Sequence, residues 1–277
     1  MGITIEEVKR LEALCAKFRA DLIDTLHKKQ TGHPGGSLSV CEILTVIYFT
    51  QAQLYPEDPR NPLRDRVVLG KGHAAPMLYR VMAEKGFFPV EEMETLRDFE
   101  TRLQGHPSIK DLPGVDLSTG PLGIGLSAAL GMALALRLDQ SAARVYAVLG
   151  DGELNEGTVW EACMCASKFG VDNLTAVIDW NGVQLDGTAR QIMPMGDLKA
   201  KFEAFGWHCI ECDGHDIGDL VRAFEEAGTI AGKPHVILAH TVKGKGVSFM
   251  EGKHIWHGKP IGNEEYISAM RELGGAD

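Results

Sequence analysis

Apolar residues recur along the chain at two different spacings, and each spacing predicts one kind of element. Between residues 5 and 29 they return every third or fourth position, which is typical of an amphipathic helix. Short apolar runs bounded by turn residues predict buried strands at 66–69, 146–149, 174–178, 207–212 and 234–241. Further helical spacing predicts helices at 42–49, 75–85, 90–99, 126–138, 158–169, 196–205, 217–231 and from 263 onward.

The order of these elements indicates the fold class. Strands alternate with helices along the chain, which is the pattern of an α/β protein with a doubly wound, mostly parallel sheet and helices on both faces. No internal repeat or linker divides the sequence, so we expect one domain over 1–277. The stretch 31–37 is rich in glycine and proline, and we expect a loop there, with a new helix starting near Ser37 or Ser39.

Polar side chains follow the two predicted central strands. The first strand ends on Gly150-Asp151-Gly152, and the second ends on Asp179-Trp180-Asn181-Gly182. A right-handed crossover places both loops at the same edge of the sheet, where Asp151 and Asn181 would face one another. Hard oxygen ligands suit Mg²⁺ or Ca²⁺, and so few of them leave positions for phosphate oxygens. This pattern predicts a metal–diphosphate clamp, although either dipeptide alone would be an ordinary turn.

Four of the ten histidines lie in similar glycine- or proline-containing loops next to predicted elements: His33, His73, His106 and His257. A single histidine in such a loop is commonly a structural turn residue. Four of them beside a diphosphate clamp favour substrate handling, because a neutral imidazole can bind hydroxyls and transfer protons near pH 7. A glycine-rich segment, 118–125, precedes the helix at 126–138 and offers backbone amides to an anion or a polar ring.

Composition narrows the function classes. The chain has 44% hydrophobic residues and a net charge of −10, with basic and acidic residues interspersed, so a nucleic-acid-binding surface is not expected. There is no signal peptide pattern and no apolar run that could span a bilayer, which predicts a cytoplasmic protein with no membrane partner. The six cysteines lack a second ligand pair at zinc-site spacing, and we expect buried, reduced thiols.

Several motifs together resemble those of one family. The segments TGHPGGSLSV, GKGHAAPMLY, LSTGPLGIGLSAALGMALA and GDGELNEG, followed by Asn181-Gly182, resemble in order and spacing the N-terminal, diphosphate-binding domain of transketolase. The stretch from GDG to Asn181 also resembles the thiamine-diphosphate signature. The resemblance covers nearly the whole chain, from the first helix to His257-Gly258. It implies the thiamine-diphosphate-binding fold.

The resemblance also implies roles for individual residues. The metal, Mg²⁺ or alternatively Ca²⁺ or Mn²⁺, would be held by Asp151, Asn181 and the backbone of Val183. The donor ketose would be bound by His33 and His257 at its hydroxyl and carbonyl end and by His106 at its first hydroxyl. The cofactor would be contacted by His73 and Gly152 at the diphosphate, and by Gly120 and Leu122 at the thiazolium side. Glu156 would belong to a carboxylate pair that links two active sites in a dimer.

The chain departs from full-length transketolases in one respect. Those enzymes continue into a pyrimidine-binding domain, which supplies the glutamate that activates the cofactor, and then into a C-terminal domain, whereas this sequence stops at Asp277. It therefore resembles the N-terminal subunit of a split transketolase, inert alone and active as a heterotetramer with a pyrimidine-binding partner. The implied activity is transfer of a two-carbon ketol unit from a ketose or ketose phosphate to an aldose or aldose phosphate.

Three alternatives stay open at this point. A subunit of a related thiamine enzyme, such as a 1-deoxyxylulose-5-phosphate synthase-like protein or a 2-oxo-acid dehydrogenase component, would share the clamp. A non-catalytic regulatory subunit could keep the same fold. The donor could also be an unusual ketose, branched or sulfonated, because the absent partner would contact the distal end of the substrate.

Overall fold

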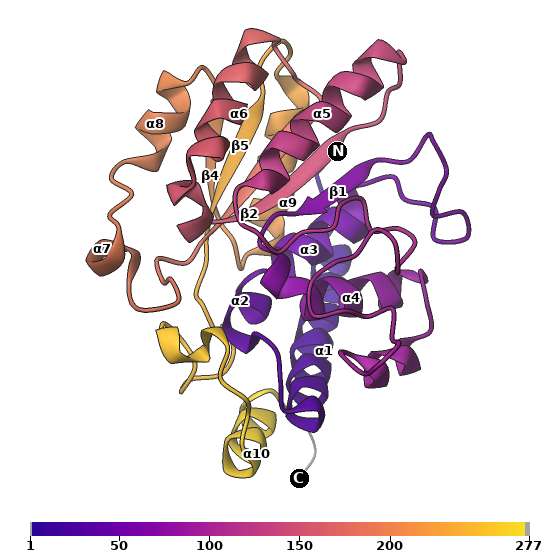
Figure 1. Ribbon diagram of the computed structural model, residues 1–277, viewed down its shortest axis with the longest axis vertical. Helices are drawn as coiled ribbons and strands as arrows, with labels where there is room; N and C mark the ends of the chain where they lie inside the picture. Colours follow the sequence, from indigo (N-terminus) through magenta and orange to yellow (C-terminus); the bar gives the residue numbers. More distant parts are fainter. Residues whose placement is uncertain (1, 275–277) are drawn as a thin grey trace.

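The computed structural model describes residues 2–274, which form one five-stranded parallel sheet covered by helices on both faces (Figure 1). The strands are β1 (Arg66–Leu69), β2 (Val145–Gly150), β3 (Leu174–Trp180), β4 (His208–Asp213) and β5 (His235–His240). All strand pairs are parallel, in the order β1-β2-β3-β5-β4. The predicted doubly wound α/β fold is therefore confirmed, and all five predicted strands are present.

The α-helices are α1 (Ile5–Lys29), α2 (Pro34–Ser39), α3 (Cys41–Val46), α4 (Ala75–Lys85), α5 (Ile124–Leu138), α6 (Gly157–Lys168), α7 (Ala189–Ile192), α8 (Leu198–Ala204), α9 (Ile217–Thr229) and α10 (Asn263–Glu272). Short 3₁₀ helices span Gly72–Ala74, Val90–Thr95, Gly152–Asn155 and His254–His257, and a π-helical turn, Ile47–Gln51, extends α3. Within the described residues, no helix is long and apolar enough to cross a membrane.

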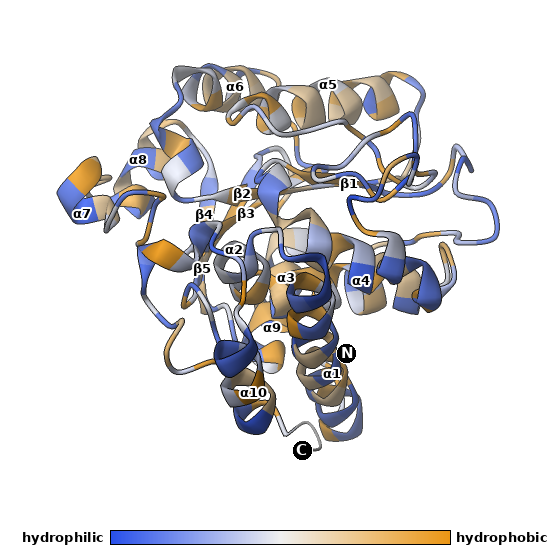
Figure 2. Cartoon of the chain, turned by 60° about the horizontal axis from the view of Figure 1, so that its bottom comes forward, coloured by the Kyte–Doolittle hydropathy of each residue, from blue (hydrophilic) through white to orange (hydrophobic). Residues whose placement is uncertain are grey.

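Two apolar layers enclose the sheet because successive strand residues point to opposite faces. In β2, Tyr146 and Val148 belong to the core formed with α1, α3, α4 and α9, whereas Ala147 and Leu149 belong to the core formed with α5, α6 and α8. Figure 2 shows α5 and α6 on one side of the sheet and α1, α3 and α9 on the other. Strands that are buried on both faces read as continuous apolar runs, which is why they could be predicted.

Two local predictions were wrong. The stretch 31–37 was expected to be a loop, but its second half forms α2, whose residues Pro34–Ser39 are all buried. Proline is favoured in the first turn of a helix, where its missing N–H leaves no hydrogen bond unmade, and the adjacent glycines allow close packing. The helix expected at 90–99 is a 3₁₀ helix that ends at Thr95, and α7 was not anticipated.

Candidate active site

The carboxyl ends of the strands meet at one edge of the sheet, and the loops that follow them surround a pocket of about 320 Å³. Because every strand is parallel, the loops after β1, β2, β3 and β5 must all emerge on this side. The pocket is lined by the following residues predicted from the sequence: His33, His73, His106, Gly120, Leu122, Asp151, Gly152, Asn181, Val183 and His257. Segments spread from residue 33 to residue 257 thus converge on one site.

Glu156 is the one predicted site residue that does not line this pocket. It is exposed at the N-cap of α6, directly after the short 3₁₀ helix Gly152–Asn155. Glu156 packs closely against Gly123, because a Cβ added to Gly123 would lie 2.7 Å from the Cβ of Glu156. The residue therefore lies beside the site on the surface.

The loops after β2 and β3 are tied together by Asp151. Its carboxylate accepts hydrogen bonds from the backbone N–H of Gly152 at 2.8 Å and of Gly182 at 2.6 Å. The side-chain oxygen of Asn181 accepts from the N–H of Val183 at 3.1 Å, which closes a turn in the loop after β3. Burial, together with the nearby charge of Asp179, raises the pKa of Asp151 to about 6. A cation bound here would stabilise the carboxylate in its ionised form.

Lys243, in the loop after β5, is a site residue that we did not predict. Its ammonium donates to the carbonyls of Val183 at 3.0 Å and Gln184 at 3.1 Å, and lies 3.0 Å from Nδ1 of His257. Burial, and then the charge of Lys71, lowers the pKa of Lys243 to about 8, so it stays mostly protonated at pH 7. Since an ammonium has only donors, Nδ1 of His257 is the acceptor and Nε2 carries the proton.

Lys71, after β1, is a second cation that we missed. Its ammonium forms an ion pair with Asp179, donates to the carbonyl of Gly36 at 2.9 Å, and is only 1% exposed. Burial alone would raise the pKa of Asp179, but the contact with Lys71 and hydrogen bonds from hydroxyls hold it below its ordinary value. This pair joins α2 to the ends of β1 and β3 beneath the pocket. The Gly-Lys-Gly sequence after a predicted strand was the available signal.

The four predicted histidines form a cluster in the wall of the same pocket. The His33 ring centroid is 5.6 Å from that of His73, 6.1 Å from His106 and 5.4 Å from His257. Burial, followed by the nearby positive charges, lowers the pKa of His33 to about 4 and that of His257 to about 3. These imidazoles are therefore neutral at physiological pH, able to donate and accept hydrogen bonds and to take up a proton.

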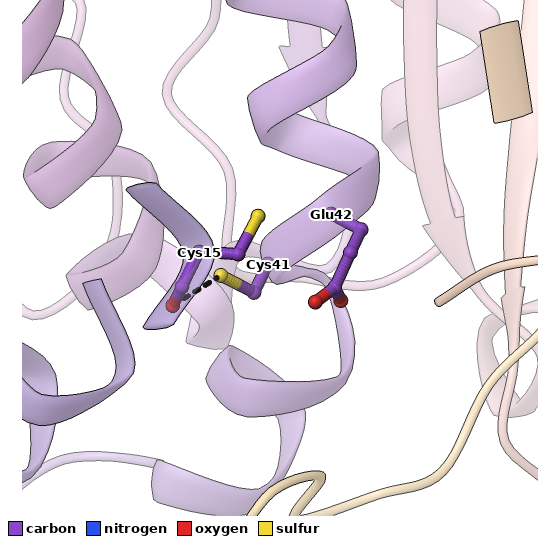
Figure 3. A group of neighbouring side chains, drawn as sticks. All are labelled: Cys15, Cys41 and Glu42. Atoms are coloured by element: carbon purple, nitrogen blue, oxygen red, sulfur yellow. Dashed lines mark hydrogen bonds between the residues drawn. The ribbon is translucent and has the colours of Figure 1, made fainter. Parts of the chain in front are cut away.

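A second buried polar cluster lies outside this pocket, where α1 meets α3 (Figure 3). Ligand atoms of Cys15, Cys41 and Glu42 lie within 4.8 Å of one another, the geometry of a possible metal site. However, Arg19 holds Glu42 through contacts of 2.6 and 2.7 Å, and His215 holds it at 2.9 Å. The guanidinium already neutralises the carboxylate, so this cluster is an ion-pair network.

All six cysteines are free thiols in the structure, as predicted, but only four of them are buried, because Cys165 and Cys209 are partly exposed. Burial raises the pKa of Cys163, Cys209 and Cys212 to about 12, which keeps these thiols protonated.

Comparisons with known proteins agree with this geometry. Residues 11–277 match the family model described as "Transketolase, thiamine diphosphate binding domain". The chain is 44% identical over 251 residues to the 6-deoxy-6-sulfo-D-fructose transketolase subunit SqwG of Clostridium sp. (strain MSTE9), covering 91% of each chain. It is 39% identical over 267 residues to an apulose-4-phosphate transketolase subunit of Phocaeicola vulgatus, covering 96% of this chain and 95% of that one.

The crystal structure of transketolase from Campylobacter jejuni superposes with a TM-score of 0.89 at 31% sequence identity. That match covers 99% of this chain and 43% of the C. jejuni chain, so this chain spans less than half of the longer enzyme. The two relatives above, in contrast, are matched over nearly their whole length and are named as subunits. The chain therefore belongs to the transketolase family, in which it corresponds to the N-terminal, thiamine-diphosphate-binding subunit of a split enzyme.

Proposed function

We propose that this chain binds thiamine diphosphate through a divalent cation, Mg²⁺ by preference, and transfers ketol units together with a partner subunit. The observation that carries the proposal is the convergence of oxygen ligands and four neutral histidines in one pocket. The metal ligands would be Asp151, Asn181 and the carbonyl of Val183. A carbonyl oxygen has two lone pairs, so Val183 can accept from Lys243 and still bind a cation.

The residues around the pocket fit a diphosphate cofactor. Nε2 of Gln184 and Nδ1 of His33 are buried without a hydrogen-bond partner, although both residues line the pocket. A Cβ on Gly36 would lie 2.9 Å from Nε2 of His73, so the wall leaves no room for a side chain there. Orphaned polar atoms beside a cavity are costly unless a ligand satisfies them. Lys71 and Lys243 supply the positive charge that a diphosphate requires.

Thiamine diphosphate, when bound, would supply the carbon nucleophile of ketol transfer. The chain's own residues would orient the donor ketose and move protons. His257 would present its Nε2–H to the sugar because Lys243 occupies Nδ1. His33 and His106 would bind the hydroxyls of the donor, as neutral imidazoles that can take up a proton.

Exposed apolar side chains at the rim of the pocket favour the presence of a partner subunit. Leu122 and Leu185 line the pocket, yet 39% and 58% of their surfaces are exposed, so apolar side chains border an open mouth. A pyrimidine-binding subunit that covers them would close the site and supply the activating glutamate. We propose two copies of each chain in a heterotetramer, with the exposed Glu156 at the contact between sites. The cytoplasmic location and the identity of the metal belong to the same proposal.

The donor is proposed to be a ketose with an unusual distal part. The relatives named above act, by their names, on 6-deoxy-6-sulfo-D-fructose and on apulose 4-phosphate. The histidine cluster of this chain suits the hydroxyl and carbonyl end that all ketoses share. The distal group would be contacted mainly by the partner, so the donor must be determined with that partner present.

The first test is native mass spectrometry of the chain purified from its own cells with Mg²⁺ and thiamine diphosphate. We expect a second polypeptide in equal number with bound cofactor, and the complex is then assayed with sulfonated, branched and ordinary ketoses. Ketol transfer by the chain without a partner would refute the split-site proposal. Absence of transfer by the complex with every donor would instead favour a regulatory subunit.

A pair of variants separates binding from turnover within that complex. His257→Ala should leave cofactor affinity unchanged and lower kcat by about 100-fold or more, the contribution expected of a proton-transferring group. The matched control is His208→Ala, because His208 lies at the opposite edge of the sheet, where β4 begins, and contacts Glu226. Asp151→Asn should instead lose the cofactor, and an equal loss of cofactor in His257→Ala would contradict the separation of roles.

A further inference from the structure

Arg97 occupies an unusual position next to the histidine cluster. It follows the 3₁₀ helix Val90–Thr95 and has a backbone φ of 62°, a conformation that residues with a side chain rarely adopt. Its N–H donates to the carbonyl of Leu103 at 3.0 Å, which closes the loop on itself. Such strained backbone persists only where the surroundings require it, and it is concentrated at functional sites.

The guanidinium of Arg97 joins two loops that are far apart in the sequence. Nη1 donates to the hydroxyl of Thr31 at 2.9 Å, two residues before His33. Nη2 donates to the carbonyl of Gly105 at 3.3 Å, one residue before His106. One planar side chain thus binds the chain just before each of the two histidines, whose rings lie 6.1 Å apart.

Gly105 shows that the second loop is shaped around this side chain. A Cβ at position 105 would lie 2.8 Å from Cζ, Nε and Nη2 of Arg97, closer than real Cβ contacts. The backbone of Gly105 is not in the left-handed region, so the close approach of Arg97 is the reason for glycine here. The Nε of Arg97 is buried without a partner.

We propose that Arg97 is a positioning residue, which ties the loop of His33 to the loop of His106 and sets the separation of the two imidazoles. The inference rests on the proposed function, because the roles of both histidines toward the donor ketose are part of that proposal. Arg97 does not line the pocket itself and acts through the two histidines.

The charge of Arg97 adds an electrostatic effect to the geometric one. Burial is the main cause of the lowered pKa of His33, and Arg97 is the next, followed by His106 and Lys243. For His106, burial and then Arg97 lower the pKa. The rings of His73 and His257 also face His33. Keeping both imidazoles neutral preserves their ability to accept a proton from a sugar hydroxyl.

The test is a pH titration of the histidine side chains by NMR in the complete chain, without partner or cofactor. Arg97→Gln removes the charge and should raise the pKa of both His33 and His106. Arg97→Lys keeps the positive charge but loses the planar guanidinium that donates to both loops, so the pKa values of both histidines should stay close to those of the wild type. The matched control is Arg102→Gln, since Arg102 contacts Glu92 and neither loop. Unchanged pKa values of both histidines in Arg97→Gln would overturn the inference.

A second variant tests the geometry without touching the arginine. Gly105→Ala should displace the guanidinium, and with the partner present both Gly105→Ala and Arg97→Gln should lower kcat/KM for the donor by about 10- to 100-fold, as small misplacements of reacting groups do. Cofactor affinity should not change. Full activity in both variants would overturn the inference, whereas an inactive wild-type complex would refute the proposed function and leave the titration result standing.

Discussion

The molecule contains two clusters of buried polar and charged side chains that differ in one decisive respect. At the junction of α1 and α3, all three guanidinium nitrogens of Arg19 have partners, and Glu42 is held by both Arg19 and His215. At the carboxyl edge of the sheet, polar atoms of His33 and Gln184 are buried without partners beside an open pocket. Buried charge alone does not indicate function, because the first cluster is complete. Unsatisfied groups around a cavity do indicate it.

The largest effect should come from breaking the complete cluster. Arg19→Met leaves the carboxylate of Glu42, which is 5% exposed, without its guanidinium. Removal of one partner of a buried ion pair should lower the free energy of unfolding by about 3–5 kcal/mol, measured by urea denaturation. Arg10→Met is the matched control, because the Arg10–Glu7 pair is at the surface and should contribute less than about 1 kcal/mol. Similar losses in the two variants would show that the cluster is not a stabilising network.

At the incomplete cluster beside the pocket, we expect a substitution to weaken cofactor binding. Asp151→Asn removes a negative oxygen ligand and should weaken metal-dependent binding of thiamine diphosphate by at least about 100-fold, since even indirect disturbance of metal ligands costs 10- to 100-fold. Calorimetry with Mg²⁺ and cofactor measures this. Glu42→Gln should leave the affinity unchanged, because Glu42 does not line the pocket. Cofactor binding that survives in Asp151→Asn would remove the metal clamp from the proposal.

The sequence predicted the incomplete cluster better than the complete one, for a physical reason. Asp151 and Asn181 each follow an apolar strand, and parallel strands bring their carboxyl ends together whatever the details of packing. Lys243 was missed because its contact with Val183 requires β5 to pair with β3, and the order of strands is not visible in the chain. Arg97 was missed because it acts from an irregular loop, where no periodicity indicates which groups meet.

The α2 segment gives the complementary case. Glycine and proline are breakers by local propensity, yet here they form a buried helical turn, because packing overrides propensity where small residues let elements approach. Because α2 packs so closely, Gly36 contacts the ring of His73, and the carbonyl of Gly36 accepts a hydrogen bond from Lys71. The segment was thus recognised as part of the site from its motif, while its conformation depended on contacts that only the folded chain has.

A smaller effect should appear in the pH dependence of stability. The ordinary pKa of histidine, 6.5, applies to the unfolded chain, whereas that of His33 in the folded protein is about 4. Above pH 6.5 neither state binds this proton, and between 6.5 and 4 only the unfolded state does, so stability is lost as the pH falls. After allowance for the partial exposure of His33, we expect the free energy of unfolding to fall by about 1–2 kcal/mol by pH 4. His33→Asn should flatten this part of the urea-denaturation profile, and parallel profiles would contradict the assignment.

The smallest expected effect is on metal binding by the complete cluster. Cys15, Cys41 and Glu42 would attract Zn²⁺ if their ligand atoms were free, since thiolates and carboxylates bind this ion. The guanidinium of Arg19 already occupies the carboxylate, and burial raises the pKa of the Cys41 thiol well above its ordinary value, which opposes the thiolate that zinc requires. Added Zn²⁺ should therefore change the melting temperature equally in the wild type and in Cys15→Ala. A zinc-dependent stabilisation that disappears in Cys15→Ala would show that the ion displaces the guanidinium and that the cluster is a metal site.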